Sequence, residues 1–147
     1  MSYNFNMQIT KATPEDFNTI LALQSQIYRA EKISDGAYKA FKKQLQKDSC
    51  EILVAKLNNQ VVATATIYYI EVALRARPYA LLEGLVVEKS HRSHGIGTAL
   101  FEKCIEIVKS KNCYKMIFTS GTDRPDAHKF YEKLGFKKWG LEFRKDL

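Results

Sequence analysis

Long apolar runs are absent from this sequence, and none approaches the roughly 20 residues that a membrane-spanning helix needs. The N-terminal stretch from Met1 to Gln8 is polar and lacks the apolar core of a signal peptide. Cysteine is scarce as well: only Cys50, Cys104 and Cys113 occur, in odd number and without a C-x-x-C pair. This usage is typical of reduced cysteines in an intracellular protein, so we expect a cytoplasmic location.

A basic block is absent too. The chain carries 23 Lys and Arg against 16 Asp and Glu, a net charge of +7, but the cations are spread along the chain. This charge admits acidic partners, yet nucleic-acid binding would need a clustered basic face or stacking aromatics, and the sequence shows neither clearly. No internal repeat, low-complexity tract or linker divides the 147 residues. We therefore expect a single domain over residues 1–147 with one core.

The stretch from Tyr79 to Lys109 combines a strand, a basic turn and a helix. A short run rich in Leu and Val precedes the turn, and apolar residues after it recur at the spacing of one helix face. The turn, Arg92-Ser93-His94-Gly95-Ile96-Gly97, lets the backbone approach a ligand closely because its glycines have no Cβ. The N–H groups of the first helical turn and the positive end of the helix dipole would then point at one place. This arrangement predicts a phosphate or pyrophosphate site, with an ordinary glycine turn as the alternative.

Two common phosphate-binding motifs do not fit this spacing. The dinucleotide motif G-x-G-x-x-G and the P-loop motif G-x-x-x-x-G-K-[ST] are both absent. A metal site is not indicated either, because His91, His94 and His128 have no carboxylate or cysteine at ligand spacing. We interpret these histidines as solvated loop residues.

The remaining segments complete a mixed pattern of strands and helices. Asn58 and Asn59 tolerate the left-handed conformation of a tight hairpin turn. Near the C-terminus, Trp139, Leu141 and Phe143 alternate with other residues, the pattern of a half-buried closing strand. We expect strands at residues 7–12, 51–57, 61–70, 115–120 and 139–143 around the central strand, and helices after Thr13, from Ser34 to about Gln46, and before Gly135. This order predicts the α/β class.

Two motifs in this chain resemble signatures of the GNAT family of N-acetyltransferases, which bind acetyl-coenzyme A. The first is Arg-x-x-Gly-x-Gly at residues 92–97. The second is the segment at residues 127–136, Ala-His-Lys-Phe-Tyr-Glu-Lys-Leu-Gly-Phe, which is similar to A-x-x-F-Y-x-x-x-G-F. The resemblance covers most of the chain. It implies a single-domain fold whose mixed, mostly antiparallel central sheet is flanked by helices and splayed at the central strand.

The second motif has a local variation. Many family members carry Asn where this chain has Arg124. The resulting R-x-D-A-H-x-F-Y form is similar to a subgroup that includes aminoalkylphosphonate acetyltransferases. That similarity is confined to the C-terminal third and does not assign a substrate.

The resemblance also implies roles for individual residues. Tyr131 corresponds to the tyrosine that usually returns a proton to the departing coenzyme A thiolate. Glu83 corresponds to a glutamate that often takes a proton from the acceptor ammonium, commonly through water. Gly84 marks the expected bulge, whose N–H groups would pair with the pantetheine arm and polarise the thioester carbonyl. The implied coenzyme contacts are Leu85, Val86, Val87, Arg92, Ser93, His94, Gly95, Ile96, Gly97 and Thr98.

We therefore expect an enzyme that transfers acetyl from acetyl-CoA to a primary amine by direct attack. Arg75 and Arg77 precede the central strand and indicate a small anionic amine, because guanidinium groups bind carboxylates and phosphates bidentately. The alternative is that these arginines are solvated or serve the coenzyme phosphates. Tyr28 or Tyr38 could line the acceptor pocket, with core packing as the alternative for each.

Several functional alternatives stay open at this point. The acyl donor could differ, the acceptor could be a protein lysine or N-terminus, or the chain could be a module that binds coenzyme A without turnover. We expect a small-molecule amine as the partner, with neither nucleic acid nor a membrane. A homodimer is left open.

Overall fold

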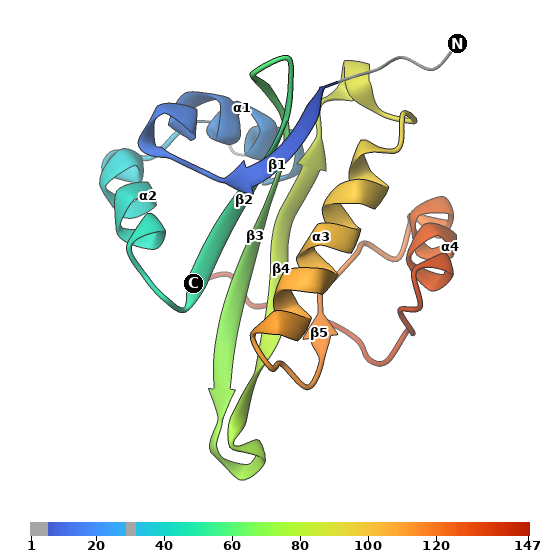
Figure 1. Ribbon diagram of the computed structural model, residues 1–147. Helices are drawn as coiled ribbons and strands as arrows, with labels where there is room; N and C mark the ends of the chain where they lie inside the picture. Colours follow the sequence, from blue (N-terminus) through green and yellow to red (C-terminus); the bar gives the residue numbers. More distant parts are fainter. Residues whose placement is uncertain (1–5, 29–31) are drawn as a thin grey trace. The chain divides into compact units, whose positions relative to one another are not determined.

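The computed structural model describes residues 6–28 and 32–147, so most of the polar N-terminal stretch from Met1 to Gln8 lies outside the described residues. The first unit of the chain runs through Ile117 and the second begins at Phe118, and each is described by itself. None of the helices in the described ranges is long and apolar enough to cross a membrane. Figure 1 shows the strands β1 (Met7–Lys11), β2 (Cys50–Leu57), β3 (Gln60–Val72), β4 (Arg77–Val87) and β5 (Met116–Ile117), and the helices α1 (Phe17–Tyr28), α2 (Ala37–Leu45), α3 (Ile96–Ser110) and α4 (Pro125–Lys133).

The five strands form one sheet in the order β1-β2-β3-β4-β5. The first four strands are antiparallel to their neighbours, and β5 is parallel to β4. Asn58 and Asn59 connect β2 to β3 with φ angles of 48° and 66°, so the predicted left-handed hairpin turn is confirmed. The mixed, mostly antiparallel sheet confirms the predicted α/β class.

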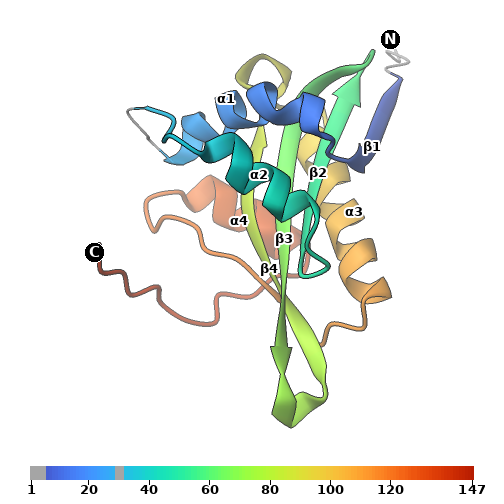
Figure 2. The ribbon, with the colours of Figure 1, turned by 90° about the vertical axis from the view of Figure 1, so that its left-hand side faces the viewer.

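Helices cover both faces of this sheet. The views in Figure 1 and Figure 2 place α1 and α2 on one face and α3 on the other. Ile20 of α1 and Phe41 of α2 are buried in one cluster with β2 residues such as Ile52. On α3, Leu100 and Cys104 are fully buried, as their helical spacing predicts. Burying a large apolar side chain contributes roughly 1.5–3 kcal/mol relative to leaving it exposed, so burial on both faces holds the sheet between its helices.

The helix ends follow local sequence signals. The Thr13 N–H donates to Asp16 Oδ2 at 2.9 Å where the chain enters a short 3-10 turn, Pro14–Asp16, that leads into α1. In the second unit, α4 is followed by Gly135 with φ of 92°, and the Phe136 N–H donates to the Tyr131 carbonyl at 3.1 Å. The predicted glycine cap of this helix is therefore confirmed.

The predicted closing strand at residues 139–143 is wrong. Among the described residues no strand follows β5, and Trp139 and Phe143 are each 92% exposed. Alternation only determines which side chains would share a face, whereas a strand also needs a neighbour that pairs its N–H and C=O groups. The strand predicted at 115–120 is also shorter than expected, because only Met116 and Ile117 pair with β4.

Candidate active site

A bulge interrupts β4 at Gly84. Glu83 is paired with Thr66 and Val86 with Thr64, so the two β4 residues between them face the single β3 residue Ala65. Gly84 has a φ of 61°, a left-handed conformation that favours glycine. The extra residue disrupts the β-ladder and re-aims the neighbouring side chains. The bulge expected at Gly84 is thus confirmed.

Glu83 lies beside this bulge, partly buried, with α1 above it. The Tyr28 hydroxyl donates to Glu83 Oε2 over a long distance of 3.5 Å. Burial, followed by the nearby Glu83 carboxylate and Tyr68, raises the pKa of Tyr28 to about 12. Tyr28 therefore stays a neutral phenol at ordinary pH and presents a proton to the carboxylate. The structure brings together two of the residues that were named for catalysis and acceptor binding.

Tyr68 is a neighbour of this pair that the sequence did not single out. It belongs to β3, two residues after the Thr66 that faces Glu83, so it lies on the same face of the sheet. Gln44 of α2 donates to the Tyr68 hydroxyl at 2.7 Å. Burial, with the Cys50 thiol as the next contribution, raises the pKa of Tyr68. The period-two pattern of β3 could have identified Tyr68 once Thr66 was known to pair with Glu83.

The predicted anion loop leads into α3. After a 3-10 turn at Lys89–His91, Ser93 and Gly95 have φ angles of 64° and 81°. The first helical hydrogen bond runs from the Ala99 N–H to the Gly95 carbonyl at 3.0 Å. No side chain in the described ranges caps Gly95, so the N–H groups of the first turn are available to a ligand. A Cβ at Gly97 would meet only Val87 Cγ2, at 3.6 Å, within ordinary contact distance.

Arg92, the first residue of the motif, makes two hydrogen bonds within the first unit. Its Nε donates to the Val87 carbonyl at 3.0 Å, and its Nη2 donates to Gln26 Oε1 of α1 at 3.2 Å. Gln26 Nε2 in turn donates to Glu88 Oε2 at 3.2 Å. Gln26 was not found from the sequence, because the residues that it contacts lie 62 and 66 positions later in the chain.

Arg75 and Arg77 lie at the other end of β4. Arg75 ends the 3-10 turn that follows β3 and Arg77 begins β4, and both guanidinium groups lie over the Tyr114 ring, at 5.0 and 5.8 Å from its centroid. Arg77 and Glu83 are six residues apart on one strand, which corresponds to about 20 Å at 3.3 Å per residue. The structure does not bring these arginines together with Glu83.

Tyr131 belongs to α4 in the second unit. Its ring contacts the Phe118 ring edge to face, with 4.6 Å between centroids, and Phe118 also contacts Phe136 at 4.9 Å. The second motif therefore builds a local aromatic cluster around Tyr131. Its role as an acid stays a prediction.

Two of the three histidines have a polar neighbour close to them in the chain. His91 Nδ1 is 3.0 Å from Ser90 Oγ, and His128 Nε2 is 2.8 Å from the Gly121 carbonyl. Among residues 6–28 and 32–147, no three His, Cys, Asp or Glu side chains are grouped so that they could hold a metal ion.

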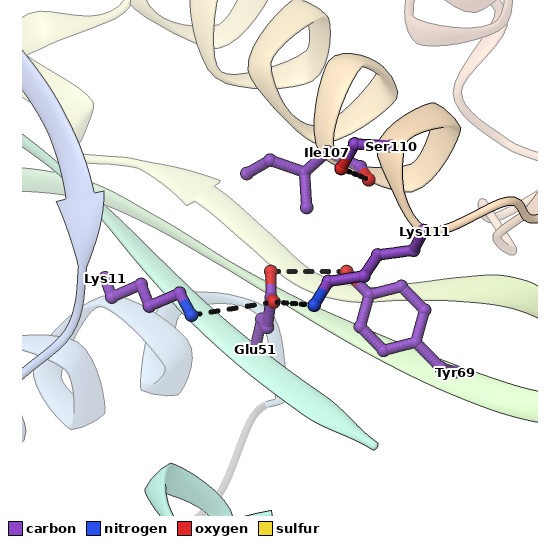
Figure 3. Close-up of polar contacts among 6 residues, drawn as sticks. All are labelled: Lys11, Glu51, Tyr69, Ile107, Ser110 and Lys111. Atoms are coloured by element: carbon purple, nitrogen blue, oxygen red, sulfur yellow. Dashed lines mark hydrogen bonds and ion pairs between the residues drawn. The ribbon is translucent and has the colours of Figure 1, made fainter. Parts of the chain in front are cut away.

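A second strand carboxylate, Glu51, lies on the opposite face of the sheet. Its neighbour Ile52 packs with α1 and α2, so alternation directs Glu51 to the α3 side. Figure 3 shows Glu51 between Lys11 and Lys111, at 3.7 and 3.5 Å, while Tyr69 donates to it at 3.2 Å. Glu51 is 8% exposed and links β1, β2, β3 and the C-terminal end of α3. We interpret this cluster as structural.

Comparison with known proteins identifies the family. The model of the acetyltransferase (GNAT) family matches residues 17–136. The chain is 42% identical over 66 residues to a glucosamine 6-phosphate N-acetyltransferase of Trypanosoma brucei brucei, covering 45% of this chain and 43% of that protein. It is 30% identical over 105 residues to a histidine N-acetyltransferase of Scomber australasicus, covering 71% of this chain and 29% of that protein.

These matches span less than half the length of either curated relative. Among solved structures, a protein of Agrobacterium tumefaciens strain C58 superposes with a TM-score of 0.84 at 31% identity, covering 94% of this chain and 99% of that one. The bulged central strand and the glycine loop before α3 are the features expected from the resemblance to this family, and the family model matches most of the chain. This chain belongs to the GNAT acetyltransferase family.

Proposed function

We propose that this protein transfers the acetyl group of acetyl-CoA to the primary amine of a small molecule. The observation that carries this proposal is the combination of the Gly84 bulge, the partly buried Glu83 beside it and the uncapped N-terminus of α3, all within the first unit. If acetyl-CoA bound with its pyrophosphate at the N-terminus of α3 and its thioester along the bulge, the thioester carbonyl would lie near Glu83.

The coenzyme assignment is supported by the chemistry of the loop. Backbone N–H groups at a helix N-terminus bind phosphate oxygens, and the helix dipole favours the negative charge. Arg92 adds a guanidinium group at the start of this loop, and Gly97 leaves space for a close approach. Bound acetyl-CoA supplies an activated acetyl group as a thioester. We assign the residues from Leu85 to Val87 to its pantetheine arm and those from Arg92 to Thr98 to its pyrophosphate.

The proton transfers are assigned to two side chains. Glu83 takes a proton from the acceptor ammonium, directly or through water, which frees the nitrogen lone pair to attack the thioester carbon. As the carbon–sulfur bond breaks, the Tyr131 hydroxyl gives its proton to the thiolate. Positioned acids and bases of this kind contribute about 10²–10⁴-fold to rate. Tyr28, a neutral donor at Glu83, lines the acceptor side.

The acceptor is proposed to carry an anionic group besides its amine. The two curated relatives named above act, by their names, on glucosamine 6-phosphate and histidine, amines that bear a phosphate or a carboxylate. The net charge of +7 also favours an anionic acceptor over a polyamine. We do not assign the anionic group to Arg75 or Arg77, because Arg77 lies about 20 Å along β4 from Glu83 and Arg75 lies two residues before the strand begins.

A panel of matched amines tests the function. Thiol release from acetyl-CoA would be measured with glucosamine 6-phosphate against glucosamine, histidine against histamine, and also with spermidine and a lysine peptide. A charge-assisted hydrogen bond is worth about 1.5–3 kcal/mol, so kcat/KM should be roughly 10- to 100-fold higher for the anionic member of the preferred pair.

Each other outcome contradicts part of the proposal. Faster turnover of spermidine would contradict the anionic acceptor, and preference for the peptide would indicate a protein acceptor. Coenzyme A binding without turnover of any amine would indicate a non-catalytic module.

A further inference from the structure

Gln26 connects helix α1 to the segment that precedes the glycine loop. Its carboxamide nitrogen donates to Glu88 and its oxygen accepts from Arg92, both at 3.2 Å. Glu88 also accepts from the Lys89 N–H at 3.0 Å through its other oxygen, which caps the 3-10 turn Lys89–His91. Three side chains from two distant parts of the chain thus form one network beside the loop.

The network orients the guanidinium group of Arg92. Nε is fixed by the Val87 carbonyl and Nη2 by Gln26. A guanidinium group is planar, so two hydrogen bonds of this kind define both its position and its plane. Ser93, with φ of 64°, follows directly, and the loop continues to Gly97. The orientation of Arg92 therefore determines where its remaining N–H groups point at the entrance of the loop.

A carboxamide is well suited to this position. It offers a donor to Glu88 and an acceptor to Arg92 at the same time, whereas a carboxylate can only accept and an ammonium can only donate. Glu88 and Arg92 are four residues apart in the chain, and no ion pair joins them within the described residues. Gln26 lies between them and hydrogen-bonds to both, so it fixes the guanidinium relative to the 3-10 turn that Glu88 caps.

We propose that Gln26 is a positioning residue for the coenzyme site, which holds Arg92 in the orientation that binds the pyrophosphate. This inference rests on the proposed binding of acetyl-CoA at the loop. Gln26 belongs to the helix that also carries Tyr28, so the same helix contacts both the coenzyme segment and Glu83.

Reversing the polarity of the network gives a sharp test. In the single variant Gln26→Glu, a second carboxylate faces Glu88, and because both groups can only accept, the hydrogen bond to Glu88 is replaced by repulsion. In the double variant Gln26→Glu with Glu88→Gln, the new amide at position 88 can donate to the new carboxylate at position 26. Its oxygen can still accept from the Lys89 N–H, and the carboxylate accepts from Arg92. All three hydrogen bonds are kept while the amide and the carboxylate exchange places.

Isothermal titration calorimetry with coenzyme A measures the effect. We expect Gln26→Ala and Gln26→Glu each to raise Kd about tenfold, a change that corresponds to about 1.4 kcal/mol and suits an exposed hydrogen bond to a charged group. The double variant should return to within about threefold of wild type. Ser25→Ala is the matched control, because its exposed hydroxyl donates to Ala22 within the same helix, and its Kd should not change. With an acceptor found by the amine panel, KM for acetyl-CoA should follow Kd while kcat changes little.

The outcomes separate this inference from the proposed function. Wild-type protein that does not bind coenzyme A would overturn both. Wild-type binding together with an unchanged Kd in Gln26→Ala would overturn the role of Gln26 alone. A double variant that binds as weakly as Gln26→Glu, with an unchanged melting temperature, would also overturn it, because a restored network should restore the site.

Discussion

Substitution of Gly84 by alanine tests the geometry of the bulge most directly. The φ of Gly84 is 61°, and a Cβ built there would lie 3.1 Å from the Tyr28 hydroxyl oxygen and 3.5 Å from Gln24 Nε2. The first contact is closer than ordinary packing allows, so the Tyr28 side chain has to move by a few tenths of an ångström. That movement would disturb its 3.5 Å contact with Glu83.

The expected cost has two parts. A non-glycine residue in the left-handed region costs about 1–2 kcal/mol, and a mild overpacking contact adds roughly 1 kcal/mol. Gly36→Ala is the matched control, because Gly36 has a φ of 81° and nothing within 4 Å of its Cβ position. The control should therefore show the strain without the contact. Since 1 kcal/mol shifts the melting temperature of a domain of this size by about 2–4 °C, the two variants should differ measurably.

A double variant isolates the contact with Tyr28. In a Tyr28→Phe background the atom nearest to the new methyl group is gone, so Gly84→Ala should cost no more than Gly36→Ala. Urea unfolding of the wild type, the two single variants Tyr28→Phe and Gly84→Ala, and the double variant gives the coupling free energy. Kinetics should show a raised acceptor KM for Gly84→Ala and an unchanged one for Gly36→Ala. An equal cost of Gly84→Ala in both backgrounds would refute the reasoning.

Four further predictions concern the coenzyme, the proton transfers, the thiols and the domain. Gly97→Val should leave the protein folded, because a Cβ at this position meets only Val87, at 3.6 Å. It should weaken acetyl-CoA binding at least about tenfold, because the added side chain occupies the space where the pyrophosphate would approach the loop. Unchanged affinity in calorimetry would remove the pyrophosphate assignment. Tyr131→Phe should lower kcat by about 10²–10⁴-fold with little change in coenzyme affinity. Glu83→Gln should lower the rate mainly at low pH, where the acceptor ammonium most needs a base. A wild-type pH–rate profile for Glu83→Gln would assign the base to water or another residue. Burial raises the pKa of the Cys104 thiol to about 12, so the contribution of this neutral thiol to the free energy of unfolding is full below about pH 9 and is lost as the pH rises toward 12. At pH 8, Cys104 should therefore react with a disulfide reagent only in urea, and rapid labelling of the native protein would contradict its burial. The single domain predicted from the length should unfold in one calorimetric transition, and two separate transitions would contradict it.

Features that depend on neighbouring residues were predictable from the sequence. The φ angles of Asn58 and Asn59 follow from a short polar turn between two apolar runs, and Gly135 ends α4 as its position indicates. The loop before α3 also has the predicted form, since its glycines and the following helical pattern determine a local backbone path. In each case a few adjacent residues contain the physical cause.

Features that depend on distant contacts were not predictable in the same way. From the sequence alone, Gln26 is one polar residue on the exposed side of a predicted helix. Only its contacts with Glu88 and Arg92 show that it has a particular position. The alternating segment at 139–143 fulfils the local requirement for a strand, yet among the described residues no strand includes it. Arg75 and Arg77 precede the central strand in sequence, but the direction of β4 places them far from Glu83, since each residue advances the strand by about 3.3 Å.

The two strand glutamates show why position in the fold decides the role of a carboxylate. Glu51 accepts a hydrogen bond from Tyr69 and pairs with two lysines, so its charge is compensated. Within the described residues no Lys or Arg pairs with Glu83, and its carboxylate accepts a hydrogen bond from the neutral Tyr28 phenol. A general base must lie within hydrogen-bond reach, directly or through one water, of the proton that it takes. Glu83 lies partly buried beside a break in the β-ladder and stays the proposed base, whereas the charge of Glu51 is compensated by two lysines.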